Sequence, residues 1–331
     1  MAESARLSRR PAPDAVARVG VVGTGVIGAG WAAHFLGRGK EVLAWDPAAD
    51  AEARLRERIG RAWPSLERIG LAAGASRERM TFLGSAAEVA AGAEVIQESA
   101  PERLDLKIDL LAELDRHAAP ETVLISSTSG YAMSDMQSAC THPERTVVGH
   151  PFNPPYLLPL VEVVGGRRTD PGTVDWTMAF YRALAKRPLR LRRELPGFVA
   201  NRLLEAVWRE ALHMVAEGEA TVAEIDAAMA YGPGLRYAVM GPCLTFHLAG
   251  GAGGMGHMLD HFGPALEEPW TRLAAPELTR ELRERMVAGC EHEAAGRSID
   301  DLEAQRDDCL IGILAALADY WAAVDALTEA E

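Results

Sequence analysis

The sequence has few cysteines and no long apolar run. Its four cysteines, Cys140, Cys243, Cys290 and Cys309, form no CxxC pair and no spacing typical of a metal site. We therefore expect free thiols of the kind found in the cytosol, and no bound metal. No stretch approaches the roughly 20 apolar residues that cross a bilayer, so no membrane segment is expected.

Basic residues are also scarce. The chain has 34 Lys and Arg against 47 Asp and Glu, which gives a formal net charge of −13. An acidic chain of this kind is a poor partner for nucleic acid or an anionic membrane. The first ten residues lack the apolar run of a signal peptide. We expect a cytoplasmic protein with a flexible tail over residues 1–15.

Two patterns divide the 331 residues, a length that favours two domains. From Arg18 to about Arg193, short apolar runs alternate with helical stretches, as in a sheet built from crossover units. The runs are residues 19–22, 41–45, 95–96, 123–125, 146–148 and 160–164. The pattern predicts an α/β fold, with a Rossmann-type doubly wound sheet over residues 16–195.

The remainder reads as helical. Val199, Leu203, Val207, Ala211 and Val215 recur every four residues, which predicts an amphipathic helix with one buried stripe. A second stripe runs through residues 310–327 and suits an internal core or a dimer interface equally. The breaker pair in Leu195-Pro196-Gly197 marks the boundary. We expect an all-α domain over residues 196–331.

A glycine motif, Gly23-Thr-Gly25-Val26-Ile27-Gly28, follows the first apolar run and opens a helical stretch. In such a turn the first glycine permits the tight bend, the second leaves room for a pyrophosphate, and the third lets helix and strand pack closely. The alternative is a glycine-rich turn without a ligand. A second match, residues 251–256, has no strand leading into it and is predicted to be a flexible connection beside the active site.

An acidic residue is expected about 20 positions after this motif, where it binds the ribose hydroxyls. Asp46 stands there, after residues 42–45. A carboxylate at this place disfavours a 2′-phosphate, so the sequence predicts NAD rather than NADP.

Two polar residues stand in the later apolar runs. His150 ends the run at 146–148, and residues beyond the carboxyl ends of parallel strands face the cofactor crevice. Glu162 interrupts the run at 160–164, where an unpaired carboxylate is costly to bury. Pairing would solve that problem and make the histidine a better base. The alternatives are a structural histidine and a solvent-facing glutamate.

Five sequence segments, taken together with their order along the chain, carry a resemblance to a known family. They are Gly23 to Gly28 with Asp46, Ser-Ser-Thr-Ser at 126–129, His-Pro-Phe-Asn-Pro at 150–154, Leu-Val-Glu-Val at 160–163 and Gly-Phe-Val-Ala-Asn-Arg-Leu at 197–203. In this order and spacing the chain resembles the 3-hydroxyacyl-CoA dehydrogenase family over about residues 18–325. The resemblance implies hydride transfer from a 3-hydroxyl group to NAD, and a homodimer paired through the helical domain.

The resemblance also implies roles for single residues. His150 is the general base and Glu162 orients it. Ser129 and Asn201 hydrogen-bond the substrate oxygens. Glu102 and Lys107 resemble a stretch that lies against the nicotinamide ribose and the substrate, although a solvated helix face explains these two equally well.

Arg236 points to the substrate class. It lies in Gly232-Pro-Gly-Leu-Arg236-Tyr237, which is similar to a segment of family members that act on free hydroxy acids. A free carboxylate needs a cationic partner, and arginine binds it through two hydrogen bonds. The alternative is a surface arginine.

Further segments of the helical half, at 245–255, 261–266, 269–271 and 296–303, are similar to those of members that oxidise carnitine. This 3-hydroxy acid carries a trimethylammonium group, which aromatic faces bind best. The aromatic residues available for it are Phe152, Tyr156, Tyr237, Phe246, Phe262 and Trp270. Each of them could instead belong to the core.

Three other functions stay open. The protein could act as an L-gulonate 3-dehydrogenase, whose polyhydroxylated substrate needs more polar contacts. It could act as a 3-hydroxybutyryl-CoA dehydrogenase, against which Arg236 argues. It could also be a non-catalytic protein like the crystallin-type lens relatives of the family, although Ser129, His150, Glu162 and Asn201 together favour an enzyme.

Overall fold

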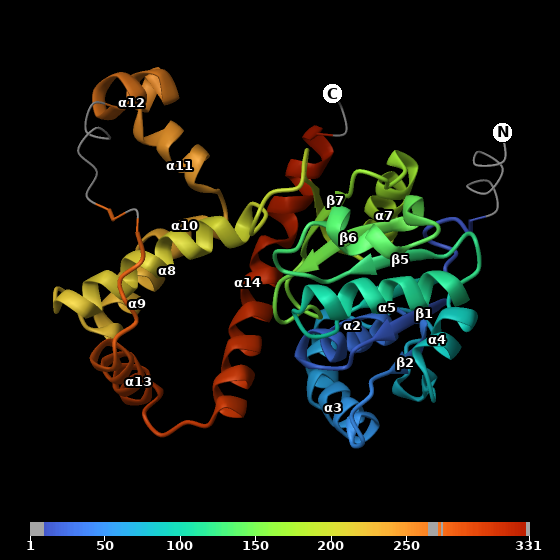
Figure 1. Ribbon diagram of the computed structural model, residues 1–331. Coiled ribbons are helices and arrows are strands. Elements are labelled where there is room, and N and C mark those ends of the chain that lie inside the picture. Colours follow the sequence, from blue (N-terminus) through green and yellow to red (C-terminus); the bar gives the residue numbers. More distant parts are fainter. Residues whose placement is uncertain (1–9, 264–270, 273, 329–331) are drawn as a thin grey trace. The chain divides into compact units, whose positions relative to one another are not determined.

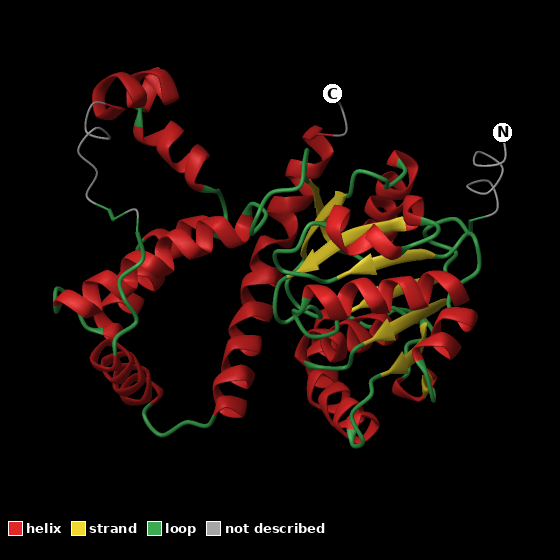
Figure 2. Ribbon diagram, viewed as in Figure 1, coloured by secondary structure: helices red, strands yellow, loops and turns green. Residues whose placement is uncertain are grey.

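A computed structural model describes residues 10–263, 271–272 and 274–328 of the chain. The chain divides into two compact units, Met1–Arg202 and Leu203–Glu331. Within the described ranges, all strands belong to the first unit and the second unit contains helices only (Figure 2). The predicted combination of an α/β unit followed by an all-α unit is therefore confirmed.

The first unit is built on one eight-stranded sheet with the order β3-β2-β1-β4-β5-β6-β7-β8. Its strands are β1 (Arg18–Val22), β2 (Glu41–Trp45), β3 (Met80–Phe82), β4 (Val95–Glu98), β5 (Val123–Ser126), β6 (Thr146–Pro151), β7 (Leu160–Gly165) and β8 (Arg187–Arg190). All neighbours pair in parallel except β6 and β7, which are antiparallel.

The observed sheet differs from the expected one in two additional strands and in the direction of one strand. The sequence did not predict β3 or β8, because these short edge strands lack a run of apolar residues; β8 reads Arg-Pro-Leu-Arg. The alternation of strands and helices also favoured parallel pairing throughout. The connection between β6 and β7 is a short loop without a crossover helix, and a short loop returns the chain antiparallel.

Helices cover both faces of this sheet (Figure 1). They are α2 (Val26–Gly37), α3 (Ala51–Ile69), α4 (Ala86–Gly92), α5 (Leu104–His117), α6 (Met133–Met136) and α7 (Pro171–Ala183). One buried cluster joins α2, α3 and α7 to side chains such as Val21 and Val147. The other joins α4, α5 and α6 to side chains such as Val22 and Val148. Successive strand residues thus enter opposite cores, which explains the continuous apolar runs.

The helical unit continues from α8 (Ala200–Glu217). Its other helices are α9 (Val222–Tyr231), α10 (Pro233–Tyr237), α11 (Pro242–Ala249), α12 (Gly254–Phe262), α13 (Arg280–Ala294) and α14 (Ile299–Thr328). Its buried apolar cluster is small and contains Val215, Val222 and Leu282. None of the helices in the described ranges is long and apolar enough to cross a membrane.

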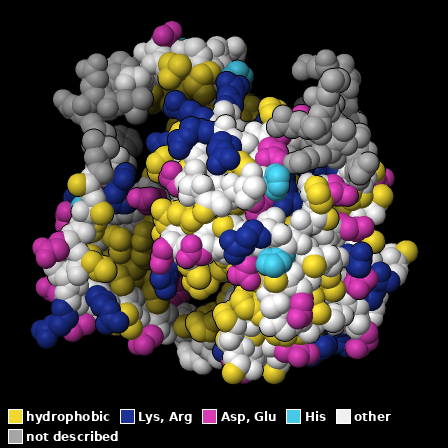
Figure 3. Space-filling model, turned by 45° about the vertical axis from the view of Figure 1, so that its right-hand side comes forward, with side chains coloured by type: hydrophobic (Ala, Val, Ile, Leu, Met, Phe, Trp, Pro, Cys, Tyr) yellow, Lys and Arg dark blue, Asp and Glu magenta, His cyan; other side chains and the backbone are white. Residues whose placement is uncertain are grey.

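The predicted stripe of α8 is not fully buried within the helical unit. Val215 packs into the small cluster, but Leu203 and Val207 are 54% and 43% exposed. Side chains such as Trp208 and Leu235 are also exposed, and hydrophobic side chains, yellow in Figure 3, appear on the surface of this unit. An amphipathic pattern predicts that the apolar face of a helix is covered, but it does not show whether the same chain or a second chain covers it.

Candidate active site

The glycine turn joins β1 to α2. Gly23 has φ +86°, and a Cβ there would lie 2.6 Å from the backbone of Ser99 and Ala100. A Cβ on Gly28 would lie 1.9 Å from the carbonyl oxygen of Gly23, so helix and turn touch. Gly25 has open space on that side, with nothing within 4 Å, and no side chain caps the helix that follows it. These three glycines leave the free cradle and free N–H groups that a dinucleotide pyrophosphate requires.

Asp46 lies directly beside this turn. One carboxylate oxygen accepts the N–H of Thr24 at 2.8 Å, and the other accepts the N–H of Ala48 at 3.0 Å. The end of β2 and the glycine turn are thereby fixed to each other. A negative charge stands next to the cradle, at the place where the ribose of a bound dinucleotide is expected.

His150 and Glu162 face each other across β6 and β7. They are directly paired in the antiparallel register, and the His150 Nδ1 lies 3.0 Å from Oε2 of Glu162. Both side chains are buried. An ionised carboxylate accepts hydrogen bonds only, so Nδ1 carries the proton and Nε2 is left as the basic nitrogen.

The segment that precedes α8 completes this pair. Gly197 and Phe198 have φ of +67° and +52°, and this bend directs the N–H groups of Val199 and Ala200 to Oε1 of Glu162, at 3.0 Å each. Burial alone raises the pKa of Glu162, but the hydrogen bonds from His150, Ala200 and Val199 outweigh burial, and the net pKa lies below its ordinary value. Glu162 is therefore an ionised partner for the histidine.

Aromatic rings enclose the imidazole. The Phe152 ring meets it edge-on at 5.1 Å between centroids, and the Phe198 ring lies 5.2 Å away at a tilt. Phe152 was expected near the substrate, whereas Phe198 was not singled out. Its position in Gly-Phe-Val-Ala-Asn, after a glycine with positive φ, is the signal that could have identified it.

Ser129 and Asn201 also come together. Asn201 Nδ2 donates to the carbonyl oxygen of Ser129 at 3.0 Å. On the other side, Glu102 Oε1 accepts the N–H of Ser129 at 3.0 Å and the hydroxyl of Thr128 at 2.5 Å. Because Asn201 follows Ala200 directly, one short segment holds both Glu162 and Ser129.

Lys107 does not lie on a solvated helix face, whereas Glu102 precedes α5 (Leu104–His117) and its side chain is 44% exposed. Lys107 is 1% exposed, and its Nζ lies 2.9 Å from Oε1 of Glu98 and 3.4 Å from Oε2 of Glu102. Glu98 was missed from the sequence. The sequence carried only a weaker signal, because Glu98 follows the polar Gln97 in β4, which reads Val-Ile-Gln-Glu, whereas Glu162 interrupts an apolar strand.

The other expected substrate residues lie in the helical unit, in the core of the first unit or outside the described residues. Arg236 and Tyr237 belong to α10, Phe246 to α11 and Phe262 to α12. Trp270 lies outside the described residues. Tyr156 packs against the core of the first unit. The second glycine motif forms a short 3-10 turn (Gly251–Gly253) and the start of α12, so it is helical rather than a loose connection.

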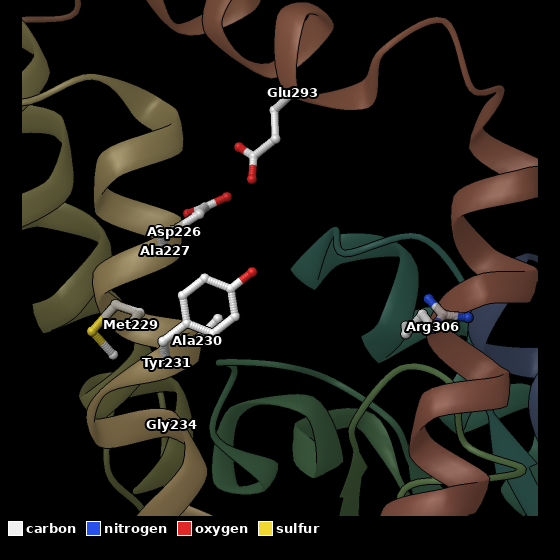
Figure 4. A pocket seen from close by; sticks show the side chains of 8 residues that line it. All are labelled: Asp226, Ala227, Met229, Ala230, Tyr231, Gly234, Glu293 and Arg306. Carbon is white, nitrogen blue, oxygen red and sulfur yellow. The ribbon is translucent and has the colours of Figure 1, made fainter.

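A hollow of about 810 Å³ opens within the helical unit. It is lined by Asp226, Ala227, Met229, Ala230, Tyr231, Gly234, Glu293 and Arg306. Figure 4 shows the carboxylates of Asp226 and Glu293 pointing toward one another. In the described part of the chain, no group of three His, Cys, Asp or Glu side chains is arranged to hold a metal ion.

The lowered pKa of Glu162 has a consequence for stability. The native state keeps this carboxyl ionised more readily than the unfolded chain does, so its stabilisation is present above the ordinary carboxyl pKa and is lost as the pH falls. We predict that Glu162→Gln flattens the acidic side of the stability curve, measured as urea midpoints from neutral pH down to about pH 3, because the loss continues below the ordinary carboxyl pKa. Glu52→Gln, at an exposed pair with Arg56, is the control and keeps the parent's slope. An unchanged slope in Glu162→Gln contradicts this account.

Comparison with known proteins identifies the family of the chain. The 3-hydroxyacyl-CoA dehydrogenase NAD binding domain matches residues 18–194, and the C-terminal domain of the same enzymes matches residues 197–294. The chain is 64% identical over 305 residues to L-carnitine dehydrogenase of Streptomyces griseus subsp. griseus, covering 92% of this chain and 91% of the relative. It is 62% identical over 320 residues to L-carnitine dehydrogenase of Nocardiopsis dassonvillei, covering 96% of each.

A solved structure is also similar along its whole length. The 5-formyl-3-hydroxy-2-methylpyridine 4-carboxylic acid 5-dehydrogenase, described as an NAD⁺ dependent dismutase, matches with a TM-score of 0.78 and 25% identity. The match covers 92% of this chain and 99% of that one. With both family models and these relatives in agreement, the chain belongs to the 3-hydroxyacyl-CoA dehydrogenase family.

Proposed function

We propose that the protein oxidises the 3-hydroxyl group of L-carnitine to 3-dehydrocarnitine, with NAD as hydride acceptor and His150 as general base. The observation that carries the chemistry is the buried His150–Glu162 pair, which leaves one imidazole nitrogen free. The choice of carnitine is supported by the relatives named L-carnitine dehydrogenase, which match nearly the whole chain.

His150 takes the hydroxyl proton in this reaction. Glu162 fixes the proton on Nδ1, so Nε2 accepts the proton of the 3-hydroxyl as the C3–O bond becomes a carbonyl. The imidazolium that forms lies beside an ionised carboxylate in a buried site, where the attraction between opposite charges is strong. NAD, when bound, supplies the acceptor for the hydride that leaves C3.

Different residues of the first unit bind the cofactor and the reacting 3-hydroxyl group of the substrate. The turn of Gly23, Gly25, Val26, Ile27 and Gly28 takes the pyrophosphate, and Asp46 the ribose hydroxyls. Glu102 and Lys107 lie against the nicotinamide ribose. Ser129 and Asn201, already linked to each other, hydrogen-bond the substrate oxygens.

Separate groups bind the two charged ends of the substrate. Arg236 binds the carboxylate through two charge-assisted hydrogen bonds. Aromatic groups among Phe152, Tyr156, Tyr237, Phe246, Phe262 and Trp270 surround the trimethylammonium, which cannot donate a hydrogen bond. Holding both ends orients the C3 hydrogen and hydroxyl, and inversion at C3 exchanges them, so one enantiomer is selected.

We further propose that residues 16–195 form the NAD-binding domain and residues 196–331 the domain for substrate binding and dimerisation. The exposed apolar residues of the helical unit support a homodimer, since Leu204 is 61% exposed and Tyr231, at the hollow of Figure 4, is 81% exposed. We place the reaction in the cytoplasm, because all four cysteines are free and a reducing compartment keeps them so.

NADH formation with L-carnitine, D-carnitine, L-gulonate and 3-hydroxybutyryl-CoA, measured in parallel, tests the proposed function. We expect turnover of L-carnitine alone, and a loss on the order of 10²–10⁴-fold in His150→Ala. Arg236→Ala should raise KM by on the order of 10–100-fold and weaken discrimination between the enantiomers. Arg280→Ala, at a 91% exposed side chain of the same unit, is the matched control.

The other outcomes of this assay each replace the proposal. If L-gulonate or 3-hydroxybutyryl-CoA reacts faster than L-carnitine, the protein is a dehydrogenase of that substrate. No NADH with any of them indicates a binding or structural protein.

Asp46 sets the choice of cofactor. Its carboxylate repels a 2′-phosphate, so we predict efficient use of NAD and poor use of NADP. Asp46→Ser keeps an oxygen beside the N–H of Thr24 but removes the charge, and the ratio of kcat/KM values for the two cofactors should narrow. Equal efficiency with NAD and NADP in the parent protein is the result that would overturn this prediction.

The homodimer can be tested at α8. Leu204→Asp places a charge on the exposed apolar face of the helical unit and should give a particle of one chain mass in light scattering after size-exclusion chromatography. Leu71→Asp, at a 36% exposed leucine of the first unit, should stay dimeric. A monomeric parent protein refutes the dimer.

A further inference from the structure

Glu98 is a fully buried carboxylate at the carboxyl end of β4. Its Oε1 accepts from Lys107 Nζ at 2.9 Å and from the N–H of Ala100 at 2.6 Å, while its Oε2 accepts the hydroxyl of Ser126 at 2.5 Å. We propose that Glu98 is a positioning residue for hydride transfer, which holds the Ser129 segment in place through two separate routes. The proposal rests on the proposed function, in which Ser129 contacts the substrate.

The first route runs through charge. Lys107 lies between two carboxylates, Glu98 at 2.9 Å and Glu102 at 3.4 Å. The Glu98 carboxylate is 0% exposed and the Glu102 side chain is 44% exposed, so the buried ammonium is neutralised by the buried acid. Glu102 therefore keeps an oxygen for other partners.

Those partners belong to the Ser129 segment. Glu102 Oε1 accepts the N–H of Ser129 and the hydroxyl of Thr128. If Glu98 loses its charge, Glu102 is the remaining carboxylate beside the ammonium of Lys107. The attraction then draws Glu102 toward Lys107 and away from Ser129, because an unpaired buried charge is strongly unfavourable.

The second route runs through the strand end. Ser126 donates its hydroxyl to Glu98 Oε2, and the same oxygen of Ser126 accepts the N–H of Thr128 at 3.2 Å. Glu98 thus holds residues 126–129 from within the sheet, while Glu102 holds them from the side of α5. Asn201 closes the arrangement at the carbonyl oxygen of Ser129.

Glu98→Gln is the test, because the amide has the same shape and lacks the charge. The matched control is Glu94→Gln, which stands next to the same strand at its opposite end and accepts the N–H groups of Ala17 and Arg18. Hydrogen exchange of the Ser129 amide is measured without cofactor or substrate, and kcat, KM and the isotope effect of C3-deuterated L-carnitine are measured alongside.

In Glu98→Gln we expect faster exchange at Ser129, kcat lower by on the order of 10²-fold, and a larger isotope effect on kcat, since misplacing the reacting group slows the chemical step. Glu94→Gln should leave all three unchanged. Glu98→Gln combined with Glu102→Gln should lose less than the product of the two single losses, because both act on Ser129 along one route.

Ser126→Ala gives a second variant that keeps the buried charge pair and removes only the second route. We expect faster Ser129 exchange and a smaller loss of kcat. The proposal is overturned if the Ser129 amide of Glu98→Gln exchanges at the rate of the parent protein. If Glu98→Gln fails to fold, an unchanged exchange rate at Ser129 in Ser126→Ala overturns the proposal instead. If the parent protein does not oxidise L-carnitine, the proposed function fails, and the exchange rates still decide whether Glu98 positions Ser129.

Discussion

The hydrogen bond between His150 and Glu162 is the contact on which the arrangement of the site depends. Glu162 accepts one hydrogen bond from the imidazole and two from the backbone of Val199 and Ala200, so a single carboxylate connects β6, β7 and the entry to α8. Asn201 follows at once and reaches the carbonyl oxygen of Ser129 at the end of β5. Without a charge at position 162, the histidine is no longer held in one tautomer, and the segment before α8 loses the acceptor of its two backbone hydrogen bonds.

The change of direction at β7 serves this contact. Parallel strands bring their carboxyl ends to one edge, which is how the glycine turn, Glu98 and His150 come to lie on the same side of the sheet. A further parallel strand needs a crossover helix before it returns. The short antiparallel connection instead places Glu162 directly opposite His150, with both side chains on the face that α4, α5 and α6 cover.

Much of this could be predicted from the sequence, because burial on both faces of a strand leaves a clear pattern. Consecutive apolar residues mark the six inner strands, and a polar residue within them is conspicuous, as His150 and Glu162 were. β8 carries no such mark, since an edge strand is half solvated. Glu98 was overlooked because its partner Lys107 lies on the following helix, and only the packing of α5 brings the two together. The stripe of α8 was expected to be buried, but periodicity does not distinguish burial within a chain from burial between chains.

The loop between β6 and β7 has a support of a different kind. Lys186 Nζ donates to the carbonyl oxygens of Pro155 and Leu158, and it lies 5.3 Å from the centre of the Trp31 ring. Burial, with a further contribution from the nearby positive charge of Arg38, lowers the pKa of Lys186 to about 7. A neutral amine still has two hydrogens for two carbonyl oxygens, so the loop stays held when this lysine loses its proton. The strands that carry His150 and Glu162 are thus joined by a contact that persists in the neutral and alkaline range, where a histidine must be unprotonated to act as a base.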